Sequence, residues 1–490
     1  MSPTPAYTVS DFISDDSPRG LFPLECQVLY AKHGSAEMSD YVKNGVFHSG
    51  DVTRAFLAAP ICYALKDARH LRKILGLDPL ANYFLYEFVH KHAKDHFQSC
   101  KPGNRRRFGY AFRNRRPLSP SEQYHEFRRD TYRLRVEFPY YAKVDIGNCF
   151  NSFYHHDVQQ FVEGRISDVA GAEIGQFLRE INSGTSVNCF PQGIYPAKAL
   201  GNLYLTFIEE NVRLKSSGII RFLDDICLFD ENQQTIFDDI YRLQEILGLH
   251  NLSLNAQKTE IGSLREHRRL KAVDVIKRRL LAKREERRSY DDATESSEKL
   301  EEYERVYLDE LLSQEVVPEE DLELAITFVD DKDTVMRVLE LVCNQHPHLI
   351  KHVHRLFGTV SFDDNGEAWE LLRTKVYSEN TTEYELFWLS KLIADYYKFD
   401  EAAAEALTHI HSHKNASPFV KASVLENPNN KLGFLELKEE QLRNSSGDIV
   451  GCAALMGLRN AVASKRNQLG KYAARAGPHM KLYADIVSKM

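Results

Sequence analysis

The sequence predicts an α+β fold, in which a mixed domain is followed by an all-helical C-terminal half. Between residues 141 and 262, short apolar runs alternate with helical patterns, which is typical of a mixed α/β domain. Beyond about residue 305, successive amphipathic segments separated by polar breaks predict helices. A polar and acidic stretch at residues 289–304 marks the boundary between the two parts. A chain of 490 residues has room for two or three domains of this kind.

The N-terminal third divides into two regions. Residues 1–100 are expected to be mostly helical, because apolar residues recur at helical spacing in residues 52–57 and 84–89. Residues 101–145 are basic and aromatic, and several prolines interrupt them, so we expect strands and loops there.

The C-terminal half contains amphipathic segments such as residues 335–342 and 402–407. Polar breaks at residues 363–366 and 427–430 separate them. The spacing is typical of an α-solenoid, but the sequence has no exact repeat period, and a plain helical bundle is the second interpretation.

Charge is unevenly distributed along the chain, whose net charge is −7. Residues 101–143 contain 12 Lys or Arg against 4 acidic residues, and residues 265–288 contain 11 against 4. Residues 311–440 are acidic, with 12 basic and 24 acidic side chains. A single basic block is often only a solvated helix face. Two such blocks bracketing residues 221–229 favour a channel that binds phosphates.

Cysteines and hydropathy restrict the cellular setting. The 8 cysteines are scattered without a CxxC pair, which argues against a zinc site or a disulfide framework and fits a reducing cytoplasm. No apolar run approaches the roughly 20 residues that span a membrane. The first residues lack a basic region followed by an apolar core, so we expect no secretory signal and a cytoplasmic location.

Two adjacent carboxylates, Asp224 and Asp225, lie between apolar runs at residues 218–220 and 226–229. Apolar runs of this length predict buried strands, so a strand, a tight Asp-Asp turn and a second strand would carry both carboxylates on an exposed hairpin tip. Mg²⁺ prefers carboxylate oxygens together with substrate phosphates, so the segment suits a phosphoryl-transfer site. An ordinary Asp-rich turn is the alternative.

A third carboxylate, Asp145, is flanked by apolar residues within the segment at residues 142–150 (AKVDIGNCF). An aspartate at the end of a strand is a natural further ligand for a two-metal site. The alternative is that Asp145 caps the helix that follows.

Four segments together resemble the motifs of reverse transcriptases in the correct order. Residues 145–156 (DIGNCFNSFYHH) resemble motif A, residues 190–198 (FPQGIYPAK) motif B, residues 221–225 (RFLDD) motif C, and residues 248–259 (GLHNLSLNAQKT) motif D. Upstream, residues 115–120 (RRPLSP) resemble a fingers motif. The N-C-F-x-S-x-Y-x-H pattern of motif A is similar to that of the prokaryotic defence-associated, abortive-infection class, one of the unknown groups of reverse transcriptases.

This resemblance covers roughly residues 50–265 and implies a right-hand polymerase. Residues 1–100 would form an N-terminal helical region and the start of the fingers, and residues 101–265 the fingers and palm. Residues 266–304 would be a connector that is first basic and then acidic. Residues 305–490 would form a helical, solenoid-like domain in place of the thumb.

The resemblance implies a metal site built from Asp145, Asp224 and Asp225, together with the backbone carbonyl of Ile146. Mg²⁺ would be the cofactor, with Mn²⁺ as a substitute. In nucleotide addition, a 3′-hydroxyl attacks the α-phosphate and pyrophosphate leaves, and carboxylate-held metals stabilise both oxygens.

The resemblance also implies substrate-binding positions. Phe150 occupies the position of an aromatic ring under the sugar, where it would collide with a ribose 2′-hydroxyl and favour dNTPs; plain core packing is the alternative. Gln192 and Gly193 would contact the incoming base or the template. Lys258 would stabilise or protonate the leaving pyrophosphate; otherwise it is a solvated lysine.

A triphosphate clamp is assigned to Arg116, with Arg113 and Arg115 as competitors for the role. The chain departs from the family pattern at Phe222, where Tyr is usual, and at Ala197-Lys198, where many relatives have a small hydroxyl residue. Phe222 should be tolerated because its ring only packs, whereas Ala197-Lys198 is expected to change the geometry with which motif B grips the template. No thumb motif is recognisable in the sequence after Thr259, so we expect the basic residues 265–288 and the helical C-terminal half to replace it.

The predicted function is therefore RNA-directed DNA polymerase activity in antiphage defence. Partners would be dNTPs, an RNA template such as a dedicated non-coding RNA, and the DNA product, without a membrane; a homo-oligomer is among the expected assemblies. One alternative is template-independent, protein-primed DNA synthesis in an abortive-infection system. Others are a catalytically dead RNA-binding scaffold, a mobile-element reverse transcriptase and an RNA-templated RNA polymerase, the last of which Phe150 disfavours.

Overall fold

The chain forms two compact units in the computed structural model, which describes residues 6–100, 102–183, 190–263, 275–289, 300–329, 331–359, 366–444 and 447–490. The first unit comprises Met1–Pro23, Tyr30–Pro60 and Leu77–Ala272. The second comprises Leu24–Leu29, Ile61–Gly76 and Val273–Met490.

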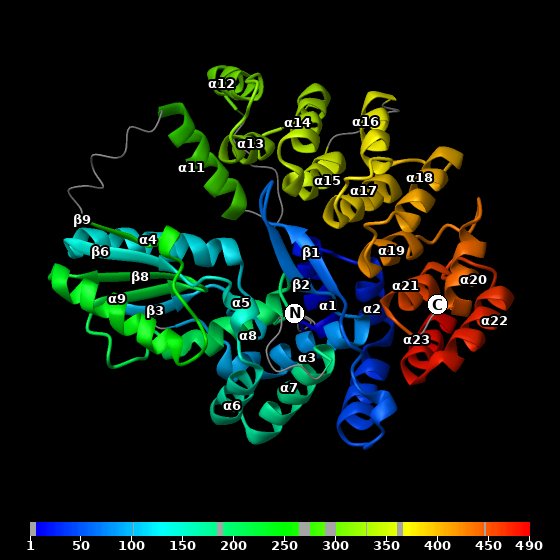
Figure 1. The fold of residues 1–490 in the computed structure, drawn as a ribbon, viewed down its shortest axis with the longest axis horizontal. Helices are drawn as coiled ribbons and strands as arrows, with labels where there is room; N and C mark the ends of the chain where they lie inside the picture. The colour runs from blue at the N-terminus through cyan, green and yellow to red at the C-terminus, as the bar shows by residue number, and fades with distance from the viewer. Residues whose placement is uncertain are drawn as a thin grey trace, which may run out of the picture. The chain divides into compact units, whose positions relative to one another are not determined.

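The first unit combines helices with one five-stranded sheet (Figure 1). The strands of this sheet are β3 (Arg105–Phe108), β6 (Tyr140–Asp145), β7 (Gly218–Phe222), β8 (Asp225–Asp230) and β9 (Glu260–Ser263). Two further strands of the unit, β4 (Phe112–Arg113) and β5 (Arg116–Pro117), form a separate two-stranded sheet. Its α-helices are α1 (Val9–Asp16), α2 (Glu25–Asp40, which begins in residues assigned to the second unit), α3 (Pro79–His96), α4 (Pro120–Glu137), α5 (Cys149–Ser152), α6 (His155–Arg165), α7 (Asp168–Ile181), α8 (Tyr195–Tyr204) and α9 (Gln233–Gly248). Short 3₁₀ turns are η1 (Ser17–Arg19), η3 (Val52–Arg54), η4 (Leu205–Phe207) and η5 (Ala256–Lys258), and η2 (Tyr41–Phe47) is a π-helix.

The five-stranded sheet has the order β3-β7-β8-β6-β9. β3 runs parallel to β7, and the other neighbours are antiparallel. Helix α4 packs on one face through a buried cluster that includes Phe127, Leu134, Tyr141, Ile220 and Phe229. Val144 and Leu228 point to the opposite face of the sheet, because side chains alternate along a strand, and they are also buried. Helix α9 contacts β6 and β8, the two strands that carry them. The sheet is therefore covered on both faces, and its strand ends are the places where polar groups can meet a substrate.

Strands and loops were expected over residues 101–145, but residues 120–137 form the helix α4. Pro120 is the first residue of this 18-residue helix, a position where the missing N–H of proline has no intrahelical partner to lose. Ser119 caps the helix by accepting the N–H of Glu122 at 3.4 Å. Proline therefore marks a helix start here rather than a break.

The second unit is largely helical, and its helices contact near neighbours in the chain, so that they follow one another in sequence order from α12 to α19 (Figure 1). It contains β1 (Ile61–Leu65), β2 (Leu71–Leu75), α11 (Val275–Ser289), α12 (Glu302–Leu312), α13 (Glu319–Ile326), α14 (Lys332–Asn344), η6 (Pro347–Leu349), α15 (Ile350–Thr359), α16 (Gly366–Val376), α17 (Glu383–Tyr396), α18 (Glu401–Ser412), α19 (Pro418–Leu425), α20 (Phe434–Asn444), α21 (Ile449–Gly457), α22 (Ala463–Ala473), η7 (Ala474–Ala476) and α23 (Pro478–Ser488).

The β1–β2 hairpin was not expected among mostly helical residues 1–100. Its two strands pair from Ile61↔Leu75 to Leu65↔Leu71, and β1 contacts α17. Gly76 follows the hairpin where an added Cβ would lie 2.2 Å from the Phe419 ring, so close packing requires glycine. The hairpin is held by the C-terminal helices, and this long-range packing leaves no local signal in the sequence.

The predicted fold class, a mixed α+β part followed by a helical C-terminal part, is confirmed. The seven cysteines in the described residues are free thiols, and Cys189 lies outside them. No helix within the described ranges is both long and apolar enough to cross a membrane. Parts of the expected 266–304 connector, residues 266–274 and 290–299, also lie outside the described ranges, as does the polar break at residues 363–365.

Candidate active site

The hairpin of β7 and β8 carries Asp224 and Asp225, but the carboxylates do not share its tip. The turn consists of Leu223 and Asp224, because Phe222 already pairs with Asp225, the first residue of β8. Leu223 adopts a left-handed backbone conformation with φ of 54°. The expected hairpin is therefore present, with the turn shifted by one residue and both carboxylates partly buried.

Asp145 is the last residue of β6 and lies directly opposite Asp225 in the antiparallel β6–β8 pairing. Directly opposed residues project from the same face of a sheet, so these two carboxylates share one face. The N–H of Ile146 donates to the Asp224 carbonyl at 3.2 Å, which joins the end of β6 to the hairpin turn. The three aspartates and Ile146 are thus brought together at one end of the sheet.

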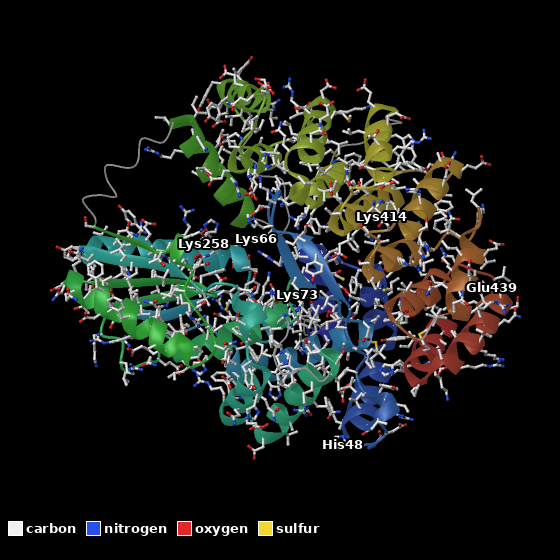
Figure 2. All side chains as sticks on the ribbon, viewed as in Figure 1. His48, Lys66, Lys73, Lys258, Lys414 and Glu439 are labelled. Carbon is white, nitrogen blue, oxygen red and sulfur yellow. The ribbon has the colours of Figure 1, made fainter. Side chains whose placement is uncertain are left out.

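Positive and polar groups lie against these carboxylates. Lys258 Nζ lies 3.3 Å from Asp145 Oδ1, and Figure 2 labels this lysine among the side chains of the first unit. Asn255 donates its side-chain amide to Asp145 Oδ2 at 3.3 Å and its backbone N–H to the Asp145 carbonyl at 2.7 Å. Lys143 Nζ lies 3.6 Å from Asp225 Oδ1. Two lysines therefore balance part of the negative charge of this cluster.

The electrostatics of Asp224 differ from those of an ordinary aspartate. Burial raises its pKa from 3.8 to about 6, and the nearby charges of Asp145 and Asp225 act in the same direction, while Lys258 opposes them. A crowded, desolvated set of carboxylates is stabilised by a cation. Its all-oxygen donor set suits Mg²⁺ or Mn²⁺.

Arg221 is the most informative residue that the sequence analysis did not single out. Its fully buried guanidinium makes a two-point ion pair with Glu209, at 2.9 Å for both contacts. It also donates to the Leu223 carbonyl at 2.9 Å and to the side chain and carbonyl of Asn202 at 2.8 and 3.0 Å. Arg221 therefore fixes the turn that carries Asp224. An arginine placed directly between the apolar run at residues 218–220 and Phe222-Leu223 is the signal that could have identified it.

The expected substrate-contacting residues of motifs A and B lie near one another. Phe150, on α5, is half-buried, and its ring centroid lies 6.2 Å from that of Phe190. Gln192 donates to the Asn151 side chain at 2.7 Å, which links the two motifs. Gly193 has a φ of 87°, a backbone conformation that favours glycine.

Arg116 lies apart from this group in its contacts. It is exposed on the short β4–β5 hairpin, with its guanidinium carbon 5.4 Å from the centroid of the Tyr7 ring. Its competitors are on the same hairpin: Arg113 pairs with Arg116 in the strands, and Arg115 is in the turn. No contact places these three arginines at the aspartates, so the triphosphate clamp stays a prediction.

Comparison with protein families identifies the part of the chain that holds this site. Residues 87–297 match the family model described as reverse transcriptase (RNA-dependent DNA polymerase). The chain carries a reverse transcriptase domain. This domain includes the five-stranded sheet and the residues that hold Asp145, Asp224 and Asp225.

Comparison with solved structures gives similarities of low sequence identity. Apo telomerase from Candida tropicalis has a TM-score of 0.32 and 11% identity, over 83% of this chain and 73% of that chain. Telomerase from Candida albicans in complex with a fragment of telomeric RNA has a TM-score of 0.27 and 12% identity, over 78% of this chain and 65% of that chain. A search of curated proteins finds no match.

Proposed function

We propose that the protein is an RNA-directed DNA polymerase that adds deoxynucleotides with the help of divalent metal ions. The observation that carries the proposal is the meeting of three carboxylates at one end of the sheet within the reverse transcriptase domain: Asp145 opposite Asp225, and Asp224 joined to Ile146. Nucleotide addition requires such a group of carboxylates, because they hold the metal ions beside the reacting phosphate.

Asp145 and Asp224 would hold the metals, with Asp225 and the Ile146 carbonyl as further ligands. The raised pKa of Asp224 supports this assignment, because a desolvated carboxylate among others is stabilised by a bound cation. Bound Mg²⁺ would supply charge stabilisation for the attacking and leaving oxygens. Lys258 would give a proton to the leaving pyrophosphate, which requires its ammonium to turn from Asp145 toward substrate.

Selection of dNTPs is assigned to Phe150, and positioning of the base or template to Gln192 and Gly193. The half-buried Phe150 ring lies on α5, the helix that begins four residues after Asp145. Phe150 is therefore near the proposed metal ligand in the chain, and its ring would lie under the sugar of the incoming nucleotide. The basic residues 101–143 would contact the nucleic-acid backbone. The template would be an RNA, and a dedicated non-coding RNA is one candidate.

We assign the activity to antiphage defence on the motif A sequence of residues 145–156. Template-independent, protein-primed synthesis is the second candidate, favoured by the absence of a recognisable thumb after Thr259 and by the helical second unit. The two modes differ in product. A discrete co-purifying RNA supports templated synthesis, whereas homopolymer DNA joined to the protein supports the untemplated mode.

The decisive experiment measures dNTP incorporation by the purified full chain with Mg²⁺ or Mn²⁺. Asp224→Asn should reduce the rate by on the order of 10³-fold, because the loss of a metal ligand removes several kcal/mol of transition-state stabilisation. Asp238→Asn, which alters a partly exposed aspartate of α9, is the matched control and should retain activity. Full activity in Asp224→Asn would refute the metal site. A correctly folded wild-type protein that incorporates no dNTP would instead favour the alternative of a catalytically dead RNA-binding scaffold. Loss of phage protection in the same variant would tie the chemistry to defence.

A further inference from the structure

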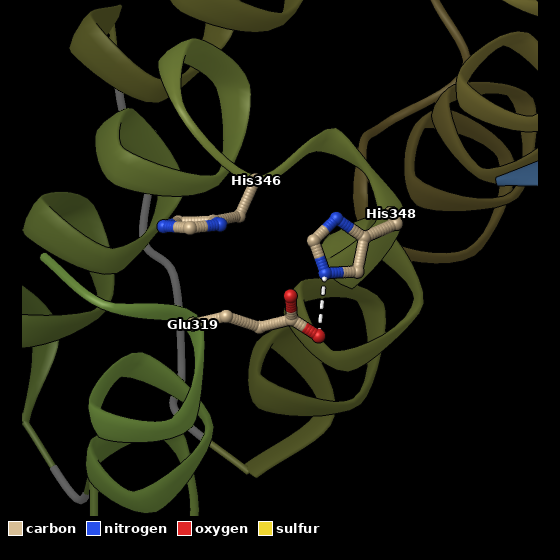
Figure 3. Close-up of side chains that lie close together, drawn as sticks. All are labelled: Glu319, His346 and His348. Carbon is tan, nitrogen blue, oxygen red and sulfur yellow. Dashed lines mark ion pairs between the residues drawn. The ribbon is translucent and has the colours of Figure 1, made fainter. Parts of the chain in front are cut away.

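Two histidines and a glutamate form a cluster in the second unit, outside the reverse transcriptase domain. Glu319 is the first residue of α13, His346 follows α14, and His348 lies in η6. One potential ligand atom from each side chain lies within 4.8 Å of the others. Figure 3 shows the three side chains converging, with the contact of His348 and Glu319 drawn as an ion pair.

His348 has an unusual environment for a polar ring. The residue is 8% exposed, and neither ring nitrogen makes a hydrogen bond in the part of the chain that the structure describes. Its Nε2 lies 3.2 Å from Glu319 Oε1, without the alignment of a hydrogen bond. A buried imidazole without hydrogen bonds lowers stability, and a bound cation at Nε2 would offset this loss.

His346 is oriented by the backbone in the manner of a metal ligand. Its Nε2 donates to the Val317 carbonyl at 2.7 Å, which leaves Nδ1 as the ring nitrogen with a free lone pair. Ligating histidines commonly donate their other N–H to a backbone carbonyl in this way. Next to it, Gln345 accepts from the Val317 N–H at 3.1 Å and donates to the Glu315 carbonyl at 2.9 Å. These hydrogen bonds hold the two chain segments together whether or not a metal is present.

The ligand types and their spacing define the metal. A tetrahedral ion with bonds of about 2.0–2.1 Å separates its ligand atoms by roughly 3.4 Å, close to the 3.2 Å between His348 and Glu319. Two imidazoles and one carboxylate suit zinc and its neighbours in the periodic table, whereas Mg²⁺ requires oxygen ligands. Glu319 is exposed, so water can reach the remaining coordination position.

We propose that Glu319, His346 and His348 bind one divalent transition-metal ion of the zinc class. The ion joins the start of α13 to the connection between α14 and α15 and so stabilises the second unit. This site is separate in chemistry and in sequence from the proposed polymerase site and does not depend on it.

The test is a Zn²⁺ titration of the full chain after chelation and dialysis, in wild type and in Asp224→Asn, so that binding at the aspartates is accounted for. We expect one Zn²⁺ per chain in both proteins, a visible absorption spectrum of nitrogen-bound Co²⁺, and a rise of about 5 °C or more in the unfolding midpoint at saturation. Excess Mg²⁺ should not displace the Zn²⁺.

Glu319→Gln and His348→Asn should each weaken Zn²⁺ binding by at least about tenfold. Glu319→Gln changes an exposed side chain and keeps its shape, so it tests the site even where His348→Asn impairs folding. His354→Asn is the control, because His354 pairs with Asp395 at 2.9 Å in the same unit, and it should bind Zn²⁺ like wild type. Wild-type affinity in Glu319→Gln, or no Zn²⁺ binding by the wild-type chain, would overturn the proposal.

Discussion

Arg221 and Glu209 form a buried, two-point ion pair behind the turn that carries Asp224. Their side chains are 0% and 5% exposed, and both contacts measure 2.9 Å. The same guanidinium donates to the Leu223 carbonyl, so the pair connects the interior of the first unit to the proposed metal site. A buried pair of this kind contributes less to net stability than to the fixed geometry of what it holds.

Removing one partner of this pair should be strongly destabilising. Arg221→Met leaves the Glu209 carboxylate buried without its cation, so the free energy of unfolding should fall by about 3–5 kcal/mol. Urea denaturation followed by circular dichroism measures the change. dNTP incorporation should fall as well, even under conditions where the variant is folded, because the Leu223 carbonyl loses its donor.

The control for this variant is Arg213→Ala, which removes an exposed ion pair with Glu245 and should change stability by no more than about 1 kcal/mol. Adding Glu209→Met to Arg221→Met should restore part of the lost stability but not the activity. Equal stability of Arg221→Met and wild type would show that the pair does not hold the core together.

Asp224→Asn should increase stability while it lowers the rate of dNTP incorporation. The pKa of Asp224 is about 6 in the folded protein, whereas an ordinary aspartate, as in the unfolded chain, has a pKa of 3.8. The folded protein therefore binds more protons than the unfolded chain between about pH 4 and pH 6. The free energy of unfolding of the wild type should therefore fall by up to about 3 kcal/mol as the pH rises through this window. Asn at this position removes that loss, so the variant should be the more stable protein at pH 7.

Chemical denaturation at a series of pH values, without divalent metal, checks this prediction. The difference between the two proteins should be small near pH 4 and largest above pH 6. Mg²⁺ should then stabilise the wild type more than Asp224→Asn. A constant difference across the pH range would mean that Asp224 does not titrate with a raised pKa.

The sequence predicted the general fold and the main elements of the candidate site for different physical reasons. Asp224 and Asp225 stand between apolar strand patterns, so a hairpin follows from local sequence. The turn residues did not follow, because the pairing of Phe222 with Asp225 depends on the register between strands. The role of Arg221 depends on Glu209, which is brought near only by the tertiary fold. The β1–β2 hairpin likewise depends on packing beside Phe419, far along the chain.

Phe150→Ala should relax discrimination against ribonucleotides. If the ring lies under the sugar, its removal makes room for a 2′-hydroxyl, and the ratio of rNTP to dNTP incorporation should rise by about tenfold or more. Single-nucleotide incorporation with matched dNTP and rNTP measures this ratio. Phe161→Ala is the control, because Phe161 is also half-buried in the first unit and packs against Tyr204. An unchanged ratio in Phe150→Ala would limit this residue to its packing against Phe153 and Phe190.

Lys258 can act through its proton or only through its charge, and two substitutions separate these roles. Lys258→Met should lower the rate of dNTP incorporation by about 10²-fold or more if the lysine protonates pyrophosphate. Lys258→Arg keeps a positive charge that can pair with Asp145, but arginine does not release its proton at ordinary pH, so it should be almost as slow. Recovery of the wild-type rate in Lys258→Arg would assign the lysine to charge balance alone. Lys215→Met, at an exposed lysine that donates to the Val212 carbonyl, is the control and should retain the wild-type rate.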